Sequence, residues 1–250
     1  MMADCLRRLW TWWTADESDS IAAEASVTSI DDVVARMQAI DAALPPVDGV
    51  ACFNRMYLEV TELVRARVAD GFFDDAAFMA RLDVVFADLY FAAVDAADAD
   101  RPVPVPWAPL VARRQDARML PIQFALAGMN AHINHDLALA VFLTCRERDV
   151  PPRRVHADYL RINQVLASVE EPVRLSFLNG AVAQVNRDLD PVIHVVDGWS
   201  IDRARDAAWA NAEALWNLRA LDGVRASFLD ALARMVGFGG RALLVPARVL

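Results

Sequence analysis

Lysine is absent from this chain, and all 25 of its basic residues are arginines. They are outnumbered by 34 acidic residues, which gives a formal net charge of -9, and no block of arginines stands out. Binding to nucleic acid requires basic surface that can neutralise phosphates, and attraction to anionic membranes requires the same. We therefore expect neither a nucleic-acid partner nor an anionic membrane surface as a partner.

Cysteine is also scarce. Cys5, Cys52 and Cys145 are an odd number and lie far apart, so they do not form a disulfide framework, and a reducing compartment is expected. The first 13 residues lack the apolar core and cleavage site of a signal peptide. No apolar run is long enough to cross a membrane, because residues 130–136 interrupt the best candidate. The sequence predicts a cytoplasmic protein without stable membrane insertion.

Glycine is rare, with nine residues, while apolar residues make up 56% of the chain. Turn signals typical of β-sheet proteins are few, and apolar residues recur at helical spacing. We predict an all-α, single-domain bundle of roughly eight helices around a buried central helix. A loose arm is expected over residues 1–29, one helical domain over 30–250, and a flexible proline-rich loop over 96–106. Helices are expected at 30–44, 51–69, 75–97, 107–114, 119–147, 153–169, 173–189 and 200–221, with a last one after Asp222-Gly223.

Several families of catalytic motif are missing. The chain has no glycine-rich phosphate loop, no G-x-S-x-G, no C-x-x-C and no H-E-x-x-H. It also lacks a pair of E-x-x-H motifs and a D-D-x-x-D. The sequence therefore predicts no nucleotide cofactor, and it excludes the most common hydrolase and di-iron signatures.

One stretch within the apolar helix at 119–147 is polar: Asn130, His132, Asn134, His135 and Asp136. Buried polar groups need partners. On a helix, side chains three and four positions apart share a face, so His132, His135 and Asp136 are expected to converge. Two imidazoles and a carboxylate suit a divalent metal such as zinc, iron or manganese. They also suit metal-free acid–base chemistry.

Other side chains are candidates for the same site. Asn134 and Asp158 are expected to support catalysis. Asp158 would either hydrogen-bond a residue that holds the metal or be a fourth ligand. A substrate pocket is predicted from Tyr57, Asn130, Tyr159 and Asn163, which lie on or near apolar stripes. Each of these residues has a purely structural interpretation too, as a buried polar group that joins neighbouring helices.

The chain resembles a family of unknown function, DUF5995. The resemblance rests on residues 48–51, 53–55 and Tyr57, on residues 123–137, and on Asp158-Tyr159 with Ile162-Asn163. It spans most of residues 30–245. Membership would imply one helical architecture and would direct attention to the central motif, but it implies no reaction.

Three functional hypotheses remain open at this point. The first is a metal-dependent, hydrolase-like enzyme acting on an apolar small molecule, with the metal held by His132, His135 and Asp136. The second is a metal-independent isomerase or cyclase of a lipid-like or terpenoid substrate, with one histidine oriented by Asp136. The third is a non-catalytic protein that binds an apolar ligand. Homo-oligomerisation is compatible with each of them.

Overall fold

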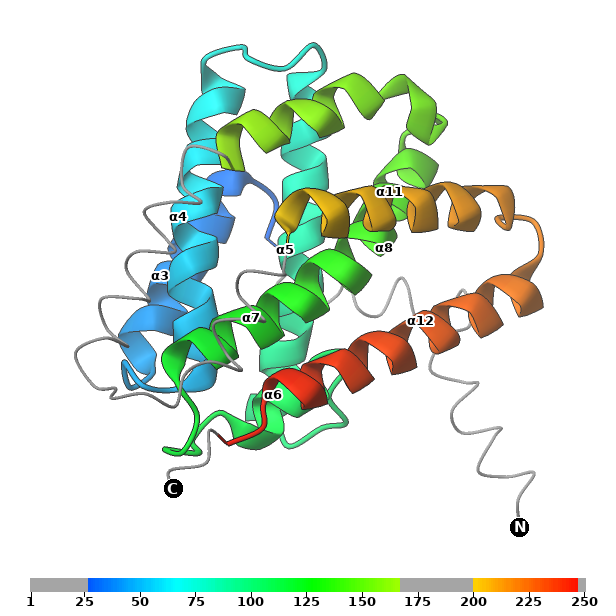
Figure 1. The fold of residues 1–250 in the computed structure, drawn as a ribbon. Coiled ribbons are helices and arrows are strands. Elements are labelled where there is room, and N and C mark those ends of the chain that lie inside the picture. Colours follow the sequence, from blue (N-terminus) through cyan, green and yellow to red (C-terminus); the bar gives the residue numbers. More distant parts are fainter. Residues whose placement is uncertain (1–26, 167–199, 247–250) are drawn as a thin grey trace.

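A computed structural model of the protein describes residues 27–166 and 200–246. Within these ranges the chain is helical and contains no β-strand, which confirms the predicted all-α class (Figure 1). The elements, in chain order, are α3 (Ile30–Ala43), α4 (Gly49–Ala69), α5 (Ala76–Asp98), α6 (Ala108–Arg113), α7 (Pro121–Ala131), the π-helix η2 (His132–Asp136), α8 (Leu137–Glu147), the 3-10 helix η3 (Pro152–Arg154), α11 (Ile201–Asn217) and α12 (Asp222–Leu243). A further helix begins at residue 156 and is described to residue 166. The expected arm before residue 27 and the expected helix at 173–189 lie outside the described residues.

Side-chain caps fix where several helices begin. The Ser29 hydroxyl accepts a hydrogen bond from the Asp32 amide, and the Asp32 carboxylate accepts one from the Ser29 amide. Asp75 and Ser200 each cap a helix with one hydrogen bond: the Asp75 carboxylate accepts from the Phe78 amide in α5, and the Ser200 hydroxyl accepts from the Arg203 amide in α11. An Asp-Gly pair is typical of a turn, but Asp48 and Gly49 are the N-cap and first residue of α4, where the Asp48 carboxylate accepts from the Val50 amide.

The polypeptide from α7 through η2 to α8 lies between other helices on two sides (Figure 1). α7 packs against α4 and α12, and α8 packs against α5 and α11. Residues 123–132 and 136–142 are buried, and residues 133–135 between them are partly buried. The stretch that carries the central motif is therefore held from both sides by the rest of the described bundle.

A glycine permits the close contact between α4 and α7. A Cβ atom added at Gly128 would lie 2.3 Å from Cδ2 of Phe53, far inside van der Waals contact. A Cβ at Gly49 would similarly lie 2.6 Å from Phe124. A glycine within a helix can allow close approach of a neighbour or a kink, and at Gly128 the structure shows close approach. This approach brings the α4 residues Phe53 and Tyr57 next to the central motif.

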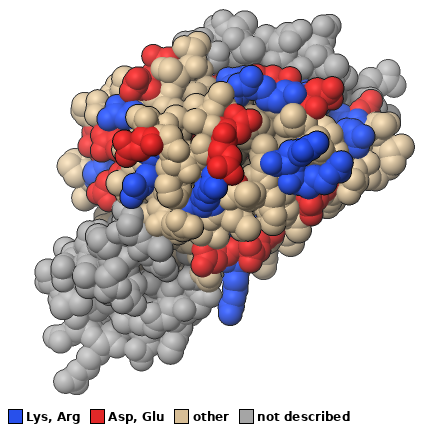
Figure 2. All heavy atoms as spheres, turned by 90° about the horizontal axis from the view of Figure 1, so that it is seen from above, with Lys and Arg blue, Asp and Glu red and all other residues tan. Residues whose placement is uncertain are grey.

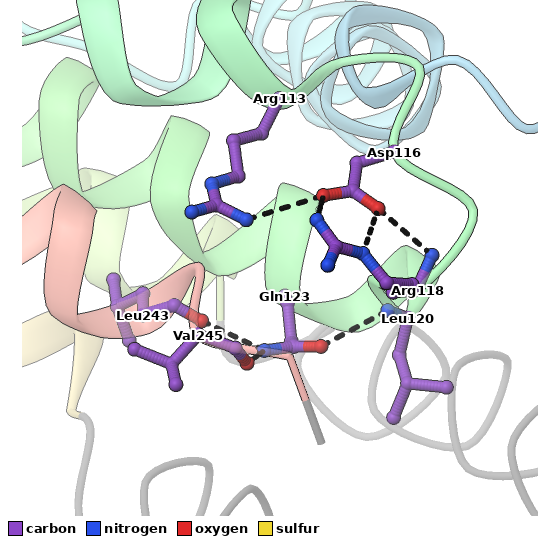
Figure 3. A network of polar contacts seen from close by, with 7 residues as sticks. All are labelled: Arg113, Asp116, Arg118, Leu120, Gln123, Leu243 and Val245. Carbon is purple, nitrogen blue, oxygen red and sulfur yellow. Dashed lines mark hydrogen bonds and ion pairs between the residues drawn. The ribbon is translucent and has the colours of Figure 1, made fainter. Parts of the chain in front are cut away.

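The C-terminal end of α12 is fastened to the start of α7 by one side chain. The side-chain nitrogen of Gln123 donates to the backbone carbonyls of Leu243 and Val245. Its side-chain oxygen accepts from the backbone amide of Leu120 (Figure 3). Because Gln123 is buried, these three hydrogen bonds satisfy all but one of its four amide positions. Beside it, Asp116 accepts from Arg113 and Arg118 and closes the turn before α7 (Figure 3).

Among the described residues, no helix is both long enough and apolar enough to cross a membrane. On the face shown in Figure 2, basic and acidic side chains are interspersed, and this face presents no extended basic area.

Candidate functional site

The central motif adopts a π-helix rather than the expected α-helix. The amide of Leu137 donates to the carbonyl of His132, five residues earlier, so this turn holds one more residue than an α-helical turn. The π-helix comprises His132–Asp136 and connects α7 to α8. Single π-turns within α-helices occur often at functional sites. The wider turn changes the directions of the motif's side chains.

Asp136 is the centre of the cluster. The Nδ1 atoms of His132 and His135 lie 3.4 Å and 2.7 Å from its Oδ2 and Oδ1 atoms, and the Trp107 indole donates to Oδ2 at 2.8 Å. Burial opposes the charged carboxylate, but the hydrogen bonds from the two imidazoles outweigh it and lower the pKa of Asp136. Asp136 is therefore a buried carboxylate whose charge three N–H groups stabilise. An imidazole that donates from Nδ1 presents Nε2 as an acceptor while it is neutral.

The His132 ring is enclosed by aromatic rings. Phe86 stacks on it with ring centroids 3.5 Å apart, and Tyr57 approaches edge-on at 4.3 Å. Phe53 and Trp107 lie further out, at 5.6 Å and 6.0 Å. Burial in this apolar enclosure lowers the pKa of His132, although the contact with Asp136 acts in the opposite direction. His132 is thus neutral at neutral pH, and its Nε2 lone pair faces the protein interior.

His132 Nε2 and Asp83 Oδ2 are buried polar atoms that lack a hydrogen-bond partner among the described residues. The Tyr57 hydroxyl, beside His132, interacts with the Thr61 side chain one helical turn away. Burial raises the pKa of Tyr57 far above its usual value, and the nearby charges of Asp83 and Asp136 raise it further. Native proteins rarely leave buried polar groups unsatisfied, so such a cluster calls for an explanation.

Asp83 is the residue of this cluster that the sequence interpretation missed. It lies on α5, 8% exposed, and burial raises the pKa of its carboxyl to about 7. The signal was present in the sequence: Met79, Asp83, Phe86 and Tyr90 are spaced by four, three and four residues, so the aspartate falls inside an apolar stripe. Trp107, which donates to Asp136, was missed as well, and no sequence periodicity links it to the motif.

Metal binding by His132, His135 and Asp136 stays a prediction. Both imidazoles direct Nδ1 at the Asp136 oxygens. In a metal site, the two imidazole nitrogens and the carboxylate would instead point together at the position of the ion. Over residues 27–166 and 200–246, no group of three or more His, Cys, Asp or Glu side chains is arranged to hold an ion. The geometry supports a carboxylate-centred hydrogen-bond cluster more directly than a metal centre.

The two asparagines of the motif face α12. Asn130 donates from Nδ2 to the carbonyl of Val236 at 2.9 Å, and its Oδ1 accepts from Asn134 at 3.2 Å. These contacts join the π-helical segment to α12. Within residues 27–166 and 200–246, no hydrogen bond joins either asparagine to the two histidines, so catalytic and pocket roles for Asn134 and Asn130 stay predictions.

Asp158 is engaged in a structural contact. Its carboxylate accepts from the amides of Asp74 and Asp75, at 2.9 Å and 2.7 Å, and from Arg161 at 2.7 Å. It therefore holds the loop that precedes α5. Among the described residues, no hydrogen bond or ion pair joins Asp158 to the His132–Asp136 cluster, and a catalytic role for it stays a prediction.

Tyr159 and Asn163 form a second buried polar group, centred on Arg205 of α11. Arg205 donates to the Tyr159 carbonyl and to Asn163 Oδ1, both at 2.6 Å, and the Tyr159 hydroxyl donates to the Arg205 carbonyl. The guanidinium also lies 4.2 Å from the centre of the Tyr159 ring. Of the four predicted pocket residues, the structure brings only Tyr57 against His132.

Comparison with known proteins gives a family but no activity. A family model described as "Family of unknown function (DUF5995)" matches residues 30–246. No match was found among curated proteins or among solved structures.

Proposed function

This chain belongs to the DUF5995 family of unknown function, and we propose that it is a metal-independent enzyme that moves a proton on an apolar small molecule. The observation that carries the proposal is the His132 Nε2 atom, which is buried and has no hydrogen-bond partner among the described residues. Its ring is held from the other side by Asp136. A neutral imidazole oriented by a carboxylate is the arrangement that general-base catalysis uses.

The acid and base can be assigned from opposite changes in pKa. Burial lowers the pKa of His132 and raises the pKa of Asp83 to about 7. Near neutral pH the histidine is then an unprotonated base, and a large fraction of Asp83 is a protonated acid. Titratable groups whose environments separate their protonation states in this way identify acid and base partners.

In the proposed reaction, a C–H bond of the substrate breaks and its proton goes to His132 Nε2. Asp83 delivers a proton to another atom of the same molecule. Tyr57, which lies edge-on against His132 and within the electrostatic influence of Asp83, offers a hydroxyl to a developing negative charge. The proton on His132 then returns to Asp83, so the net change is an isomerisation. Asp136 stabilises the imidazolium that forms in the first step.

The class of substrate follows from the enclosure. Phe53, Phe86 and Trp107 offer apolar and aromatic surface around one polar position. An apolar molecule with one polar group adjacent to an acidic C–H bond matches that combination. Because His132 is only 3% exposed, the enclosure must open to admit the substrate.

The proposal can be tested without knowing the substrate. Purified protein is incubated in heavy water with fractionated apolar metabolites, and mass spectrometry looks for compounds that gain deuterium. We expect at least one compound to be deuterated by the wild type and not by His132→Gln. The matched control is His156→Gln, because His156 stacks on Trp209 at 4.3 Å and, in the described part of the chain, Asp136 pairs with His132 and His135 instead. Deuteration that persists in His132→Gln would overturn the assignment of the base.

A non-catalytic apolar-ligand carrier is the alternative that the same enclosure supports. It is distinguished by native mass spectrometry of the same samples. A ligand that copurifies unchanged with both the wild type and His132→Gln, together with an absence of deuterium incorporation, would replace catalysis by binding.

A further inference from the structure

Three polar groups lie in or beside the enclosure of His132, and they differ in what they can offer a ligand. His132 Nε2 is a hydrogen-bond acceptor while the ring is neutral, because Nδ1 is directed at Asp136. Asp83 Oδ2 is buried and has no hydrogen-bond partner within residues 27–166 and 200–246. Tyr57 lies edge-on against His132, with ring centroids 4.3 Å apart, and its hydroxyl is near enough to Asp83 for that charge to raise the pKa of Tyr57.

Asp83 and Tyr57 both present hydrogen-bond donors near neutral pH. Burial raises the pKa of Asp83 to about 7, so much of this carboxyl carries a proton, and a protonated carboxyl donates. The pKa of Tyr57 is raised far above its usual value, so its hydroxyl stays protonated. Thr61, one turn further along α4, interacts with this hydroxyl. Because a hydroxyl accepts and donates at once, Tyr57 can accept from Thr61 and still donate to a ligand.

The charges around these groups disfavour a charged ligand. The charges that raise the pKa of Tyr57 are those of Asp83 and Asp136, and burial alone raises the pKa of Asp83. A buried anion would therefore meet acidic neighbours, without a cation to offset its lost hydration. A cation would need Asp83 to lose the proton that burial makes it keep. The polar group that fits is an uncharged acceptor.

We propose that the substrate of this site is an uncharged apolar ketone or aldehyde, whose carbonyl oxygen accepts from Tyr57 and Asp83 while an adjacent C–H bond faces His132 Nε2. This inference rests on the proposed function and names the class of compound on which it acts. Two donors on one oxygen suit an enol, because negative charge develops on the carbonyl oxygen as the enol forms.

The proposed step balances within the three side chains and the substrate. His132 takes the proton of the C–H bond, and the electron pair of that bond forms the C=C bond of the enol. The π electrons of the carbonyl move to its oxygen, which takes the proton of Asp83. The proton on His132 then returns to Asp83. The site thus interconverts the keto and enol forms of one compound, with no other reactant.

The first test measures which polar group the site prefers. Four probes share a naphthalene ring and differ in one substituent: acetylnaphthalene, ethylnaphthalene, naphthoate and naphthylmethylammonium. Their binding to the full chain is measured by equilibrium dialysis. We expect acetylnaphthalene to bind roughly tenfold more tightly than each of the others, because it alone brings an uncharged acceptor. Equal binding of acetylnaphthalene and ethylnaphthalene, tighter binding of either charged probe, or no binding of acetylnaphthalene would overturn the proposal.

Variants assign the preference to the two donors. Tyr57→Phe and Asp83→Leu each remove one donor, so the affinity for acetylnaphthalene should fall roughly tenfold while that for ethylnaphthalene changes little. Asp83→Asn keeps a donor of similar size and should retain most of the affinity. Tyr90→Phe is the matched control, because the Tyr90 hydroxyl is buried in the same core but donates to Asn54. Unchanged affinity in both Tyr57→Phe and Asp83→Leu, with circular dichroism showing folded protein, would overturn the assignment.

This test and the test of the proposed function fail independently. Deuteration that persists in His132→Gln would remove His132 as the base, yet a preference for the uncharged carbonyl probe would still identify what the enclosure binds. Deuteration that depends on His132, together with no preference among the four probes, would retain the base and overturn the class of substrate.

Discussion

At the scale of single residues, the described structure concentrates its unusual chemistry on one carboxylate. Asp136 is buried and accepts three N–H groups from His132, His135 and Trp107. His135 keeps 12% of its side chain exposed, while His132 keeps only 3%. The same aspartate therefore joins an enclosed imidazole to one that contacts solvent. Removing its charge is expected to affect stability and site geometry together.

Asp136→Asn should destabilise the fold by about 3 kcal/mol, because the amide replaces one acceptor oxygen by a donor that faces N–H groups. For a chain of this size, the melting temperature should fall by roughly 10 °C. Thermal unfolding followed by circular dichroism measures this. Glu213→Gln, an exposed acid on α11, is the control and should change the melting temperature little. Equal melting temperatures for Asp136→Asn and the wild type would show that the cluster does not stabilise the fold.

Asp83 makes a prediction about pH. Its pKa is raised from 3.8 to about 7 by burial, so between these values the folded protein keeps a proton that the unfolded chain has lost. Stability contributed by this group is therefore present at low pH and declines as the pH rises to about 7. Asp83→Asn has no such loss. We expect it to gain stability relative to the wild type from about pH 4 to about pH 7 and to keep a constant advantage above.

The measurement is the free energy of unfolding of Asp83→Asn minus that of the wild type, taken at each pH. The contributions of the other titratable groups are the same in both proteins and cancel in this difference. Burial also lowers the pKa of His132 from 6.5, and this acts in the opposite direction: its contribution is lost as the pH falls below 6.5. A difference curve that is flat across this window would mean that Asp83 titrates normally in the folded protein.

At the scale of helices, sequence patterns were most reliable where the physics is local. Residue types at the helix starts indicated Ser29 or Asp31, Asp74-Asp75, and Ser200 or Asp202 as caps; the caps are Ser29, Asp75 and Ser200, and a cap depends only on residues within one turn. The pattern H-x-x-H-D predicted that His132 and Asp136 converge, and His132 Nδ1 lies 3.4 Å from Asp136 Oδ2. It did not reveal the π-turn, because the same residues satisfy an α-helical spacing equally well.

The partners of the motif were not predictable from periodicity. Trp107 lies 29 positions before Asp136 in the chain, and no sequence pattern indicated that α5, which carries Asp83, packs against η2. Which helix faces which is decided by close approaches such as the one at Gly128. Asp158 and Tyr159 shared the polar character of the motif, yet Asp158 binds the loop before α5 and Tyr159 binds α11.

Gly128→Ala tests how strictly the α4–α7 contact is required. The added Cβ would meet the Phe53 ring at 2.3 Å, so the helices must separate or Phe53 must move. We expect a loss of about 2 kcal/mol, and a change in the environment of Tyr57 and His132 that is visible in near-ultraviolet circular dichroism. Gly223→Ala is the control, because nothing lies within 4 Å of a Cβ there and alanine favours helix. If both variants are equally stable, the packing of α7 on α4 is looser than the structure indicates.

At the scale of the whole molecule, the run of chain that carries the site also holds α12. The π-helical segment presents His132 and Asp136 to the α4–α5 side, while Asn130 binds the Val236 carbonyl of α12 on the other side. Gln123, at the start of α7, binds the Leu243 carbonyl at the end of the same helix. α12 therefore supports the segment before the histidines at two points, so the geometry of the site depends on a helix that lies behind it.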